Sequence, residues 1–244
     1  MRAHENPFRT QRLGSLAFRH PDWTAKALRE RLDALGGRAA IVGPHGSGKT
    51  TLLGELGAGL EREGLRVRRR FLNADAARPW FPALLGEARA LRAGDALLFD
   101  GAGHLPRWQW RALARAGRGA SALLVTAHCV GLLPTLVETR TDAALLAELT
   151  GELLSRPAGP LAPLLEELRE QHAGNLRDVF LGLYDLAARD EPRVAAALAA
   201  RDEPGVAATL AAADEPRIEA LLSNETRRKG RTPPASRTEG RRCR

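Results

Sequence analysis

The sequence predicts a three-layer α/β fold with a parallel sheet, followed by a small helical lid and a disordered basic tail. Short apolar runs alternate with amphipathic stretches from residue 38 to residue 141, a pattern typical of buried strands separated by helices. A glycine-rich segment with one lysine follows the first of these runs. After Asp142 only helical patterns remain, so we expect the sheet to end before that residue.

The elements are expected in the following order. An irregular lead-in precedes a helix within Trp23–Leu35, which Gly36 and Gly37 end. The expected strands are Ala39–Val42, Leu65–Leu72, Ala96–Phe99, Ala122–Thr126 and Thr135–Thr139, and the expected helices between them are Lys49–Arg62, Pro82–Arg92 and Arg107–Ala116. Four arginines in the second strand favour a place at the edge of the sheet.

The C-terminal third of the chain is expected to be helical and then repetitive. Helical patterns cover Ala143–Leu154, Ala162–Gln171 and Leu176–Ala188. A 12-residue repeat of acids, proline and alanines then starts at Arg189, Arg201 and Ala213. It is either an alanine-rich helix of low complexity or a docking surface. The predicted parts are a lead-in with its helix (1–37), a nucleotide-binding core (38–141), a helical lid (142–189), the repeat (190–222) and the tail (223–244).

Composition limits the possible environments and partners. No apolar run reaches the roughly 18 residues that a membrane-spanning helix needs. The two cysteines lie far apart and form no framework of several disulfides, which favours a cytoplasmic protein. The net charge is +8, of which +7 falls within residues 226–244. This tail either binds a polyanion such as nucleic acid or only keeps the protein soluble, and it has no aromatic residue to stack on bases.

The glycine-rich segment after the first strand predicts a phosphate-binding loop. Glycines let backbone N–H groups turn toward phosphates, and the following helix N-terminus adds a positive dipole. Lys49 is expected to reach the β- and γ-phosphates of a nucleotide, Thr50 to ligate Mg²⁺, and Thr51 to approach the α-phosphate. The predicted binding residues are Gly43, Pro44, His45, Gly46, Ser47, Gly48, Lys49, Thr50 and Thr51.

A second motif is the apolar strand that ends at Asp100. A carboxylate at the end of a strand beside the loop can hold the hydration shell of Mg²⁺, whereas the alternative is an aspartate that caps the next turn. About 50 residues separate Lys49 from Asp100, with one strand predicted between them. That strand points to the branch of P-loop ATPases with an additional strand.

The chain resembles a small member of that additional-strand branch, closest in organisation to AAA+ ATPases, over roughly residues 38–188. The loop Gly43–Leu53 is also similar to that of ABC transporter ATPases, but no Leu-Ser-Gly-Gly-Gln signature occurs. The AAA+ resemblance rests on the Walker A loop, on the second motif and on Gly174–Arg177, which resembles the second sensor of the AAA+ lid. Together with Arg107-Trp108-Gln109-Trp110 and Gly131-Leu132-Leu133-Pro134-Thr135-Leu136, the whole is similar to short uncharacterised bacterial P-loop proteins.

The resemblance implies roles for two further residues and also shows two departures. Arg177 corresponds to the lid arginine that touches the γ-phosphate, and otherwise is a solvated charge. His128 stands near the γ-phosphate-sensing position, and otherwise is a plain loop histidine; His104 is better explained as the start of a helix. Gly101 occupies the place of the catalytic glutamate, and no arginine finger lies between Thr126 and Thr135.

These observations predict an ATP-dependent switch or slow ATPase that binds ATP with Mg²⁺. One alternative is a nucleotide-stabilised interaction module that does not hydrolyse ATP, and a second is a small-molecule phosphotransferase. A GTPase is disfavoured because guanine recognition uses an Asn/Thr-Lys-x-Asp run, and lysine occurs only at 26, 49 and 229. The sequence does not indicate a protein partner.

Overall fold

The computed structural model describes residues 2–20, 22–72 and 80–199, so the predicted tail and most of the repeat lie outside the described residues. The strands are β1 (Arg38–Val42), β2 (Arg66–Phe71), β3 (Asp95–Asp100), β4 (Ala122–Ala127) and β5 (Thr135–Glu138). The α-helices are α1 (Thr10–Leu13), α2 (Ala25–Ala34), α3 (Lys49–Arg62), α4 (Phe81–Ala90), α5 (Arg107–Ala116), α6 (Ala143–Leu154), α7 (Ala162–Gln171), α8 (Leu176–Ala188) and α9 (Pro192–Ala199). Short 3₁₀ turns occur at Ala102–His104, Gly117–Gly119 and Gly159–Leu161.

The five strands form one parallel sheet in the order β2-β3-β4-β1-β5. In space β4 lies between β1, which leads into the phosphate loop, and β3, which ends at Asp100. The carboxyl ends of β1, β3 and β4 therefore lie at the same end of the sheet, which is where ligands bind in open α/β folds. β2 is an edge strand, as its arginines predicted.

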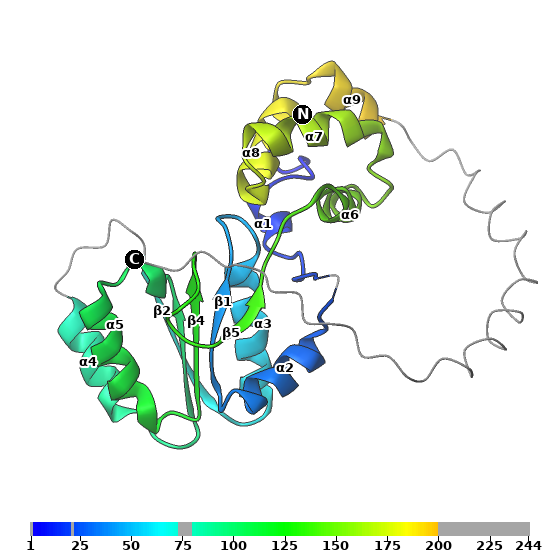
Figure 1. Ribbon diagram of the computed structural model, residues 1–244. Helices are drawn as coiled ribbons and strands as arrows, with labels where there is room; N and C mark the ends of the chain where they lie inside the picture. The colour runs from blue at the N-terminus through cyan, green and yellow to red at the C-terminus, as the bar shows by residue number, and fades with distance from the viewer. Residues whose placement is uncertain (1, 21, 73–79, 200–244) are drawn as a thin grey trace, which may run out of the picture.

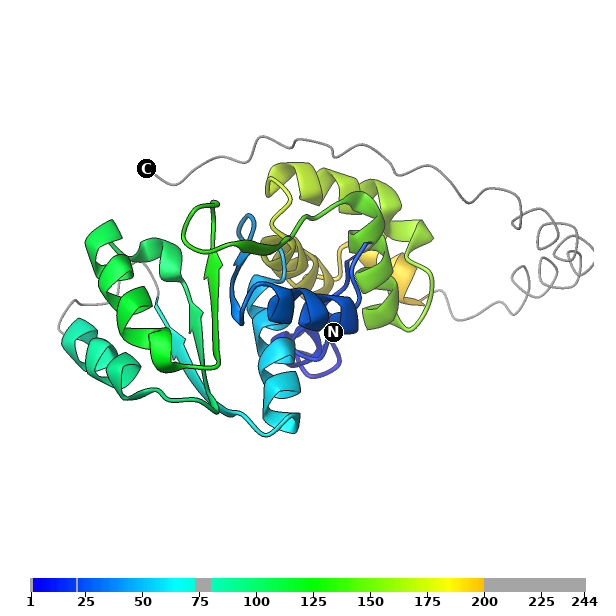
Figure 2. The same cartoon turned by 60° about the horizontal axis from the view of Figure 1, so that its bottom comes forward.

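Helices cover both faces of the sheet, which gives the predicted three layers (Figure 1). Helices α4 and α5 lie together on one face in both views (Figures 1 and 2), and their apolar side chains share a core with Leu97, Phe99 and Leu123. Helices α2 and α3 cover the other face and enclose Ile41 and Leu98. Strands β1, β3 and β4 are mostly apolar on both faces because both of their faces are buried.

The helices that follow the sheet pack into a separate apolar cluster, and the N-terminus of the chain is part of it. Phe8, which is 1% exposed, packs with apolar residues of α6, α7, α8 and α9. The Asn6 amide donates a hydrogen bond to the Tyr184 carbonyl at 3.0 Å. These four helices and the N-terminal segment lie beside the end of the sheet that carries the phosphate loop (Figure 1). In the part of the chain that the structure describes, no helix is long and apolar enough to cross a membrane.

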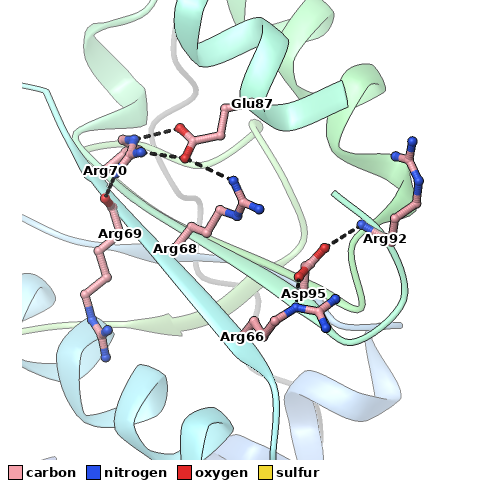
Figure 3. Close-up of polar contacts among 7 residues, drawn as sticks. All are labelled: Arg66, Arg68, Arg69, Arg70, Glu87, Arg92 and Asp95. Atoms are coloured by element: carbon pink, nitrogen blue, oxygen red, sulfur yellow. Dashed lines mark hydrogen bonds and ion pairs between the residues drawn. The ribbon is translucent and has the colours of Figure 1, made fainter. Parts of the chain in front are cut away.

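The arginines of β2 are held by carboxylates from neighbouring elements (Figure 3). Arg68 and Arg70 both reach Glu87 of α4, and Arg66 donates to Asp95 at 2.7 Å. Arg69 points to the other face and pairs with Glu61 of α3. The edge strand therefore presents paired charges to solvent, which disfavours addition of another strand.

Candidate functional site

The phosphate loop connects the end of β1 to the start of α3. Gly46 and Gly48 have φ values of 66° and 81°, the left-handed region that favours glycine. The Ser47 hydroxyl lies 2.6 Å from the Thr139 hydroxyl, and the Thr139 amide donates to the Val42 carbonyl at 2.7 Å. The loop is thereby fixed to the chain just after β5 as well as to the strand it follows.

Lys49 is the first residue of α3, and its side chain folds back over the loop. The ammonium donates to the Pro44 carbonyl, and the residue is only 8% exposed. Burial lowers the pKa of Lys49, and the nearby Asp100 carboxylate partly offsets this effect. A bound phosphate group would supply further countercharge to this buried ammonium.

Thr50 and Asp100 bring two oxygen donors together beside Lys49. The Thr50 hydroxyl donates to the Asp100 carboxylate at 2.7 Å, although the two residues lie 50 positions apart. A hydroxyl and a carboxylate are the hard oxygen ligands that Mg²⁺ prefers. Because the protein supplies only a few ligands, the remaining coordination positions stay open for waters and phosphate oxygens. The donors present therefore fit Mg²⁺ held together with a nucleotide.

Thr126, the second threonine at Asp100, was not singled out from the sequence. Its hydroxyl donates to the other oxygen of Asp100 at 2.5 Å and accepts from the Gly101 amide at 2.8 Å. Thr126 is 2% exposed and lies in β4, next to β3 in the sheet. The one signal in the sequence is a polar residue at the end of the apolar run Ala122–Val125. That signal points to Asp100 only once the two strands are known to be neighbours.

The structure also explains why glycine occupies position 101. Gly101 has φ +90°, and a Cβ built there would lie 2.0 Å from the Leu72 carbonyl oxygen. That carbonyl belongs to the chain just after β2, where the Leu72 amide donates to the Asp100 carbonyl at 2.9 Å. The turn after Asp100 therefore has no space for a side chain at position 101, where the resemblance to AAA+ ATPases would place the catalytic glutamate.

His128 lies in the cleft, but its recorded contacts are with the phosphate loop and with two other histidines. Its Nδ1 is 3.3 Å from the Gly43 carbonyl, and its ring centroid lies 4.0 Å from that of His45 and 5.7 Å from that of His104. Burial, the Lys49 charge and His45 lower the pKa of His128, so its neutral form is favoured at neutral pH. Within the described residues, no group of three or more histidine, cysteine or acidic side chains could hold a metal ion.

The first turn of α8 brings the lid against the phosphate loop. The Asn175 side chain accepts a hydrogen bond from the Arg177 amide at 3.2 Å and so caps the helix. A Cβ built at Gly46 would lie 1.8 Å from the Asn175 side-chain oxygen, so the two segments are in close contact. Arg177 is exposed and lines the same cleft as Lys49 and Asp100.

The cleft has a volume of about 750 Å³, within the range of small-molecule sites. Its polar end is formed by the phosphate loop, Asp100 and the three histidines. The cleft also has an apolar lining, which includes Leu13, Leu16, Phe18, Leu145, Leu149 and Phe180. The first three belong to the N-terminal segment, which the sequence indicated only as an irregular lead-in.

No protein-family model and no curated protein matches the sequence. Among solved structures, a variant of RuvB from Thermotoga maritima aligns with a TM-score of 0.49 and 16% identity, covering 73% of this chain and 68% of that one. A DNA replication initiation factor aligns with a TM-score of 0.49 and 15% identity, covering 74% and 68%. PCH-2 from C. elegans aligns with a TM-score of 0.33 and 11% identity, covering 68% and 66%.

The class of the protein follows from its own strand order and loop. A parallel sheet in which β4 lies between the loop strand β1 and the acidic strand β3, with a glycine-rich phosphate loop between β1 and α3, is a three-layer α/β fold of the P-loop NTPase type.

Proposed function

We propose that this protein binds ATP with Mg²⁺ and acts as a nucleotide-dependent switch with slow turnover. The observation that carries the proposal is the convergence of Lys49, Thr50 and Asp100 at the end of the phosphate loop, with 2.7 Å between the Thr50 hydroxyl and the Asp100 carboxylate. When bound, Mg²⁺ would neutralise charge on the terminal phosphates. Lys49 and the loop amides hold the phosphates, and Asp100 and Thr50 hold the metal.

The apolar lining of the cleft suits the base of the nucleotide. Side chains of the N-terminal segment, α6 and α8 form its walls, and the Arg19 guanidinium bonds Glu148 and Glu152 of α6 to keep the segment in place. An apolar slot with few polar groups accepts a purine ring by stacking and burial. Adenine is favoured over guanine because the chain has no Asn/Thr-Lys-x-Asp run.

Slow turnover, or none, is favoured by the turn at Gly101. A group that orients the attacking water contributes several orders of magnitude to the rate, and the backbone at position 101 leaves no space for one. The same observation supports the second candidate, an interaction module that ATP stabilises but that does not hydrolyse it. In both, the nucleotide acts by holding the lid, through Arg177, against the loop.

The proposal is tested by calorimetric titration of ATP with matched lysine variants. Lys49→Ala should weaken ATP binding by roughly 100-fold or more, because it removes charged hydrogen bonds to two phosphates. Lys26→Ala, at an 87% exposed side chain, should leave the affinity unchanged. Equal affinity of the two variants, both folded by circular dichroism, would show that the loop does not bind ATP.

The metal is tested with Asp100→Asn. Its ATP affinity should fall about tenfold or more with Mg²⁺ present, and much less in EDTA, because the lost charge faces the metal. An equal loss in both conditions would make Asp100 a structural residue.

A further inference from the structure

Helix α5 carries an arginine surface that the nucleotide site does not use. No aspartate or glutamate occurs from residue 101 to residue 137, whereas arginines occur at 107, 111, 115 and 118. Trp108, Arg111 and Arg115 of α5 and Arg118 of the 3₁₀ turn Gly117–Gly119 follow one another at steps of three or four residues, and all four are exposed. Residues at this spacing share one side of a helix, and we call these four the α5 stripe. Ten residue steps separate Trp108 from Arg118, so the stripe is about 15 Å long at the rise of an α-helix.

The arginines of the stripe have no acidic partner among the described residues, unlike those of β2. Arg66 bonds Asp95 and Arg70 bonds Glu87 (Figure 3), and Arg69 bonds Glu61. Arg111, Arg115 and Arg118, by contrast, make no ion pair with any described aspartate or glutamate. Their guanidinium groups are therefore available to an anion from outside the chain.

A depression of about 450 Å³ opens along this stripe. Among the described residues, the charged side chains that line it are those of Arg38, Arg111, Arg115 and Arg118. Arg38 donates to the carbonyls of Ala114 at 2.8 Å and Gly117 at 3.1 Å, so its guanidinium caps the C-terminal end of α5. Burial and the charge of Arg118 lower the pKa of Arg38, as expected where positive charges gather without acids.

Trp108 gives the stripe an aromatic surface at its other end. The side chain is 65% exposed, an unusual position for a tryptophan. Its ring packs on Phe81 of α4 in a T-shaped arrangement, with 5.7 Å between centroids and an interplanar angle of 77°. Phe81 in turn packs on Trp80. The contact with Phe81 thus orients the Trp108 ring, while much of the ring surface remains accessible to solvent.

We propose that the α5 stripe binds single-stranded nucleic acid, with Trp108 stacking on a base and Arg111, Arg115 and Arg118 contacting phosphates. Unpaired arginines beside an exposed aromatic ring are the two components of sequence-tolerant single-strand binding. A duplex hides its base faces and would not use Trp108, and an acidic peptide would not need a stacking surface. The surface is separate from the cleft, because Arg38 begins β1 and the phosphate loop follows its other end.

The test compares the full chain with two triple variants by fluorescence anisotropy of labelled dT20 and rU20. The first variant is Arg111→Ala/Arg115→Ala/Arg118→Ala. The second is Arg62→Ala/Arg140→Ala/Arg189→Ala, which removes the same charge at exposed arginines elsewhere. The basic residues 226–244 are present in all three proteins, so their contribution cancels in the comparison.

The stripe variant should lose affinity for both oligonucleotides, whereas the control should not. Three phosphate contacts contribute a slope of about −2 to the dependence of log affinity on log salt, hence roughly a 100-fold loss at 0.1 M salt. Trp108→Ala should weaken binding by about 5- to 150-fold, with Trp108→Phe between it and wild type. Circular dichroism and ATP affinity should be unchanged.

Several outcomes would overturn the proposal. Binding by the stripe variant within about threefold of the control would place the site elsewhere. Equal competition by a duplex, or by poly-L-glutamate of matched charge, would show a surface for polyanions in general. No binding by the wild type would also end the proposal.

Discussion

At the residue scale, the centre of the site is one carboxylate shared by two threonines. Asp100 accepts from Thr50 on one oxygen and from Thr126 on the other. The second bond fixes the rotamer, because Thr126 is buried in β4 and its own hydroxyl is held by the Gly101 amide. Asp100 is thereby held in position for a ligand at the loop, which reduces the ordering that binding requires.

The first residue-scale prediction concerns Gly101. Gly101→Glu should not raise ATP hydrolysis above the slow rate expected for the wild type, below about 1 s⁻¹. It should instead destabilise the protein by roughly 1–3 kcal/mol from backbone strain alone, and the close contact with the Leu72 carbonyl adds to this. Urea unfolding and single-turnover hydrolysis measure the two effects.

Gly103→Ala is the matched control for that variant. Gly103 has an ordinary φ, and a Cβ there would meet its nearest neighbour, the His128 amide nitrogen, at 3.6 Å. The change in unfolding free energy should stay within about 0.5 kcal/mol. A Gly101→Glu protein as stable as this control, or one that hydrolyses ATP faster than wild type, would contradict the geometry of the turn.

The second residue-scale prediction concerns pH and His128. Its pKa in the folded protein is lowered from the usual 6.5, so below that pH the unfolded chain takes up the proton first. The contribution of His128 to the free energy of unfolding should therefore be fully present above about pH 6.5. It should decrease as the pH falls toward the lowered pKa of His128 in the folded protein. His128→Asn should show a smaller loss between pH 7 and pH 5 in urea midpoints. Parallel profiles for the two proteins would show that His128 does not contribute.

At the element scale, β2 shows how a strand with four arginines is kept in a sheet. Asp95 begins β3 beside the first arginine of β2, and its carboxylate accepts from Arg66 at 2.7 Å and from the Arg92 amide at 2.7 Å (Figure 3). The Asp95 side chain is 4% exposed, whereas the Arg66 side chain is 72% exposed. The Asp95 carboxylate therefore connects, through hydrogen bonds, the edge strand β2 with the turn that precedes β3.

The element-scale prediction follows from this bond. The Arg66 hydrogen bond, and then the Arg92 amide, lower the pKa of Asp95 below its usual 3.8. A lowered carboxyl pKa stabilises the fold above pH 3.8, and this stabilisation is lost as the pH falls below it. Asp95→Asn should thus have a lower urea midpoint than wild type at pH 7, and the gap should close below about pH 3.8. A gap that is independent of pH would show that packing, and not charge, is responsible.

The elements were largely predictable from the sequence, because their signals are local. The helices Lys49–Arg62, Arg107–Ala116, Ala143–Leu154, Ala162–Gln171 and Leu176–Ala188 have the predicted bounds, and the strands differ from prediction by one residue at most at each end. Apolar periodicity, glycines and capping residues such as Asp142 fix these bounds.

The contacts that join distant elements were not predictable. Thr126 reaches Asp100 only because β4 lies beside β3, and the sequence does not encode that order in any local pattern. The N-terminal lead-in lacks periodicity, so nothing in it indicated that Leu16 and Phe18 line the cleft. The crowding at Gly101 depends on the Leu72 carbonyl after β2, so the sequence alone shows only that a glycine follows Asp100.

At the scale of the whole molecule, the cleft lies between parts that are far apart in the chain. The loop comes from the sheet, Arg177 from the lid, and Phe18 from the N-terminal segment, where the Phe18 amide donates to Glu55 of α3 at 2.6 Å. A nucleotide that contacts all three would hold them together, so its affinity depends on their arrangement.

The whole-molecule prediction concerns Arg177 and the difference between ATP and ADP. If the lid arginine meets the γ-phosphate, Arg177→Ala should weaken ATP binding by about 10- to 150-fold, the effect of one hydrogen bond to a charged group, and should weaken ADP binding much less. Arg62→Ala, on the exposed side of α3, is the control. Calorimetric titration with ATP and with ADP measures both affinities for the two variants and the wild type. Equal losses for ATP and ADP would mean that Arg177 does not sense the γ-phosphate.

The N-terminal segment has a consequence for the order in which the chain gains its parts during synthesis. Asn6 bonds the Tyr184 carbonyl, across 178 positions of sequence, and Phe8 lies in the core that α8 and α9 complete. At about 5–20 residues per second, the ribosome takes roughly 9–36 s to make the intervening chain. Until α8 and α9 have been made, Asn6 and Phe8 lack the residues that they contact in the folded protein, whereas strands β1 to β5 can already pair. The apolar wall of the cleft is thus the last part of it to form, and a nascent chain has its phosphate loop well before it has a complete site.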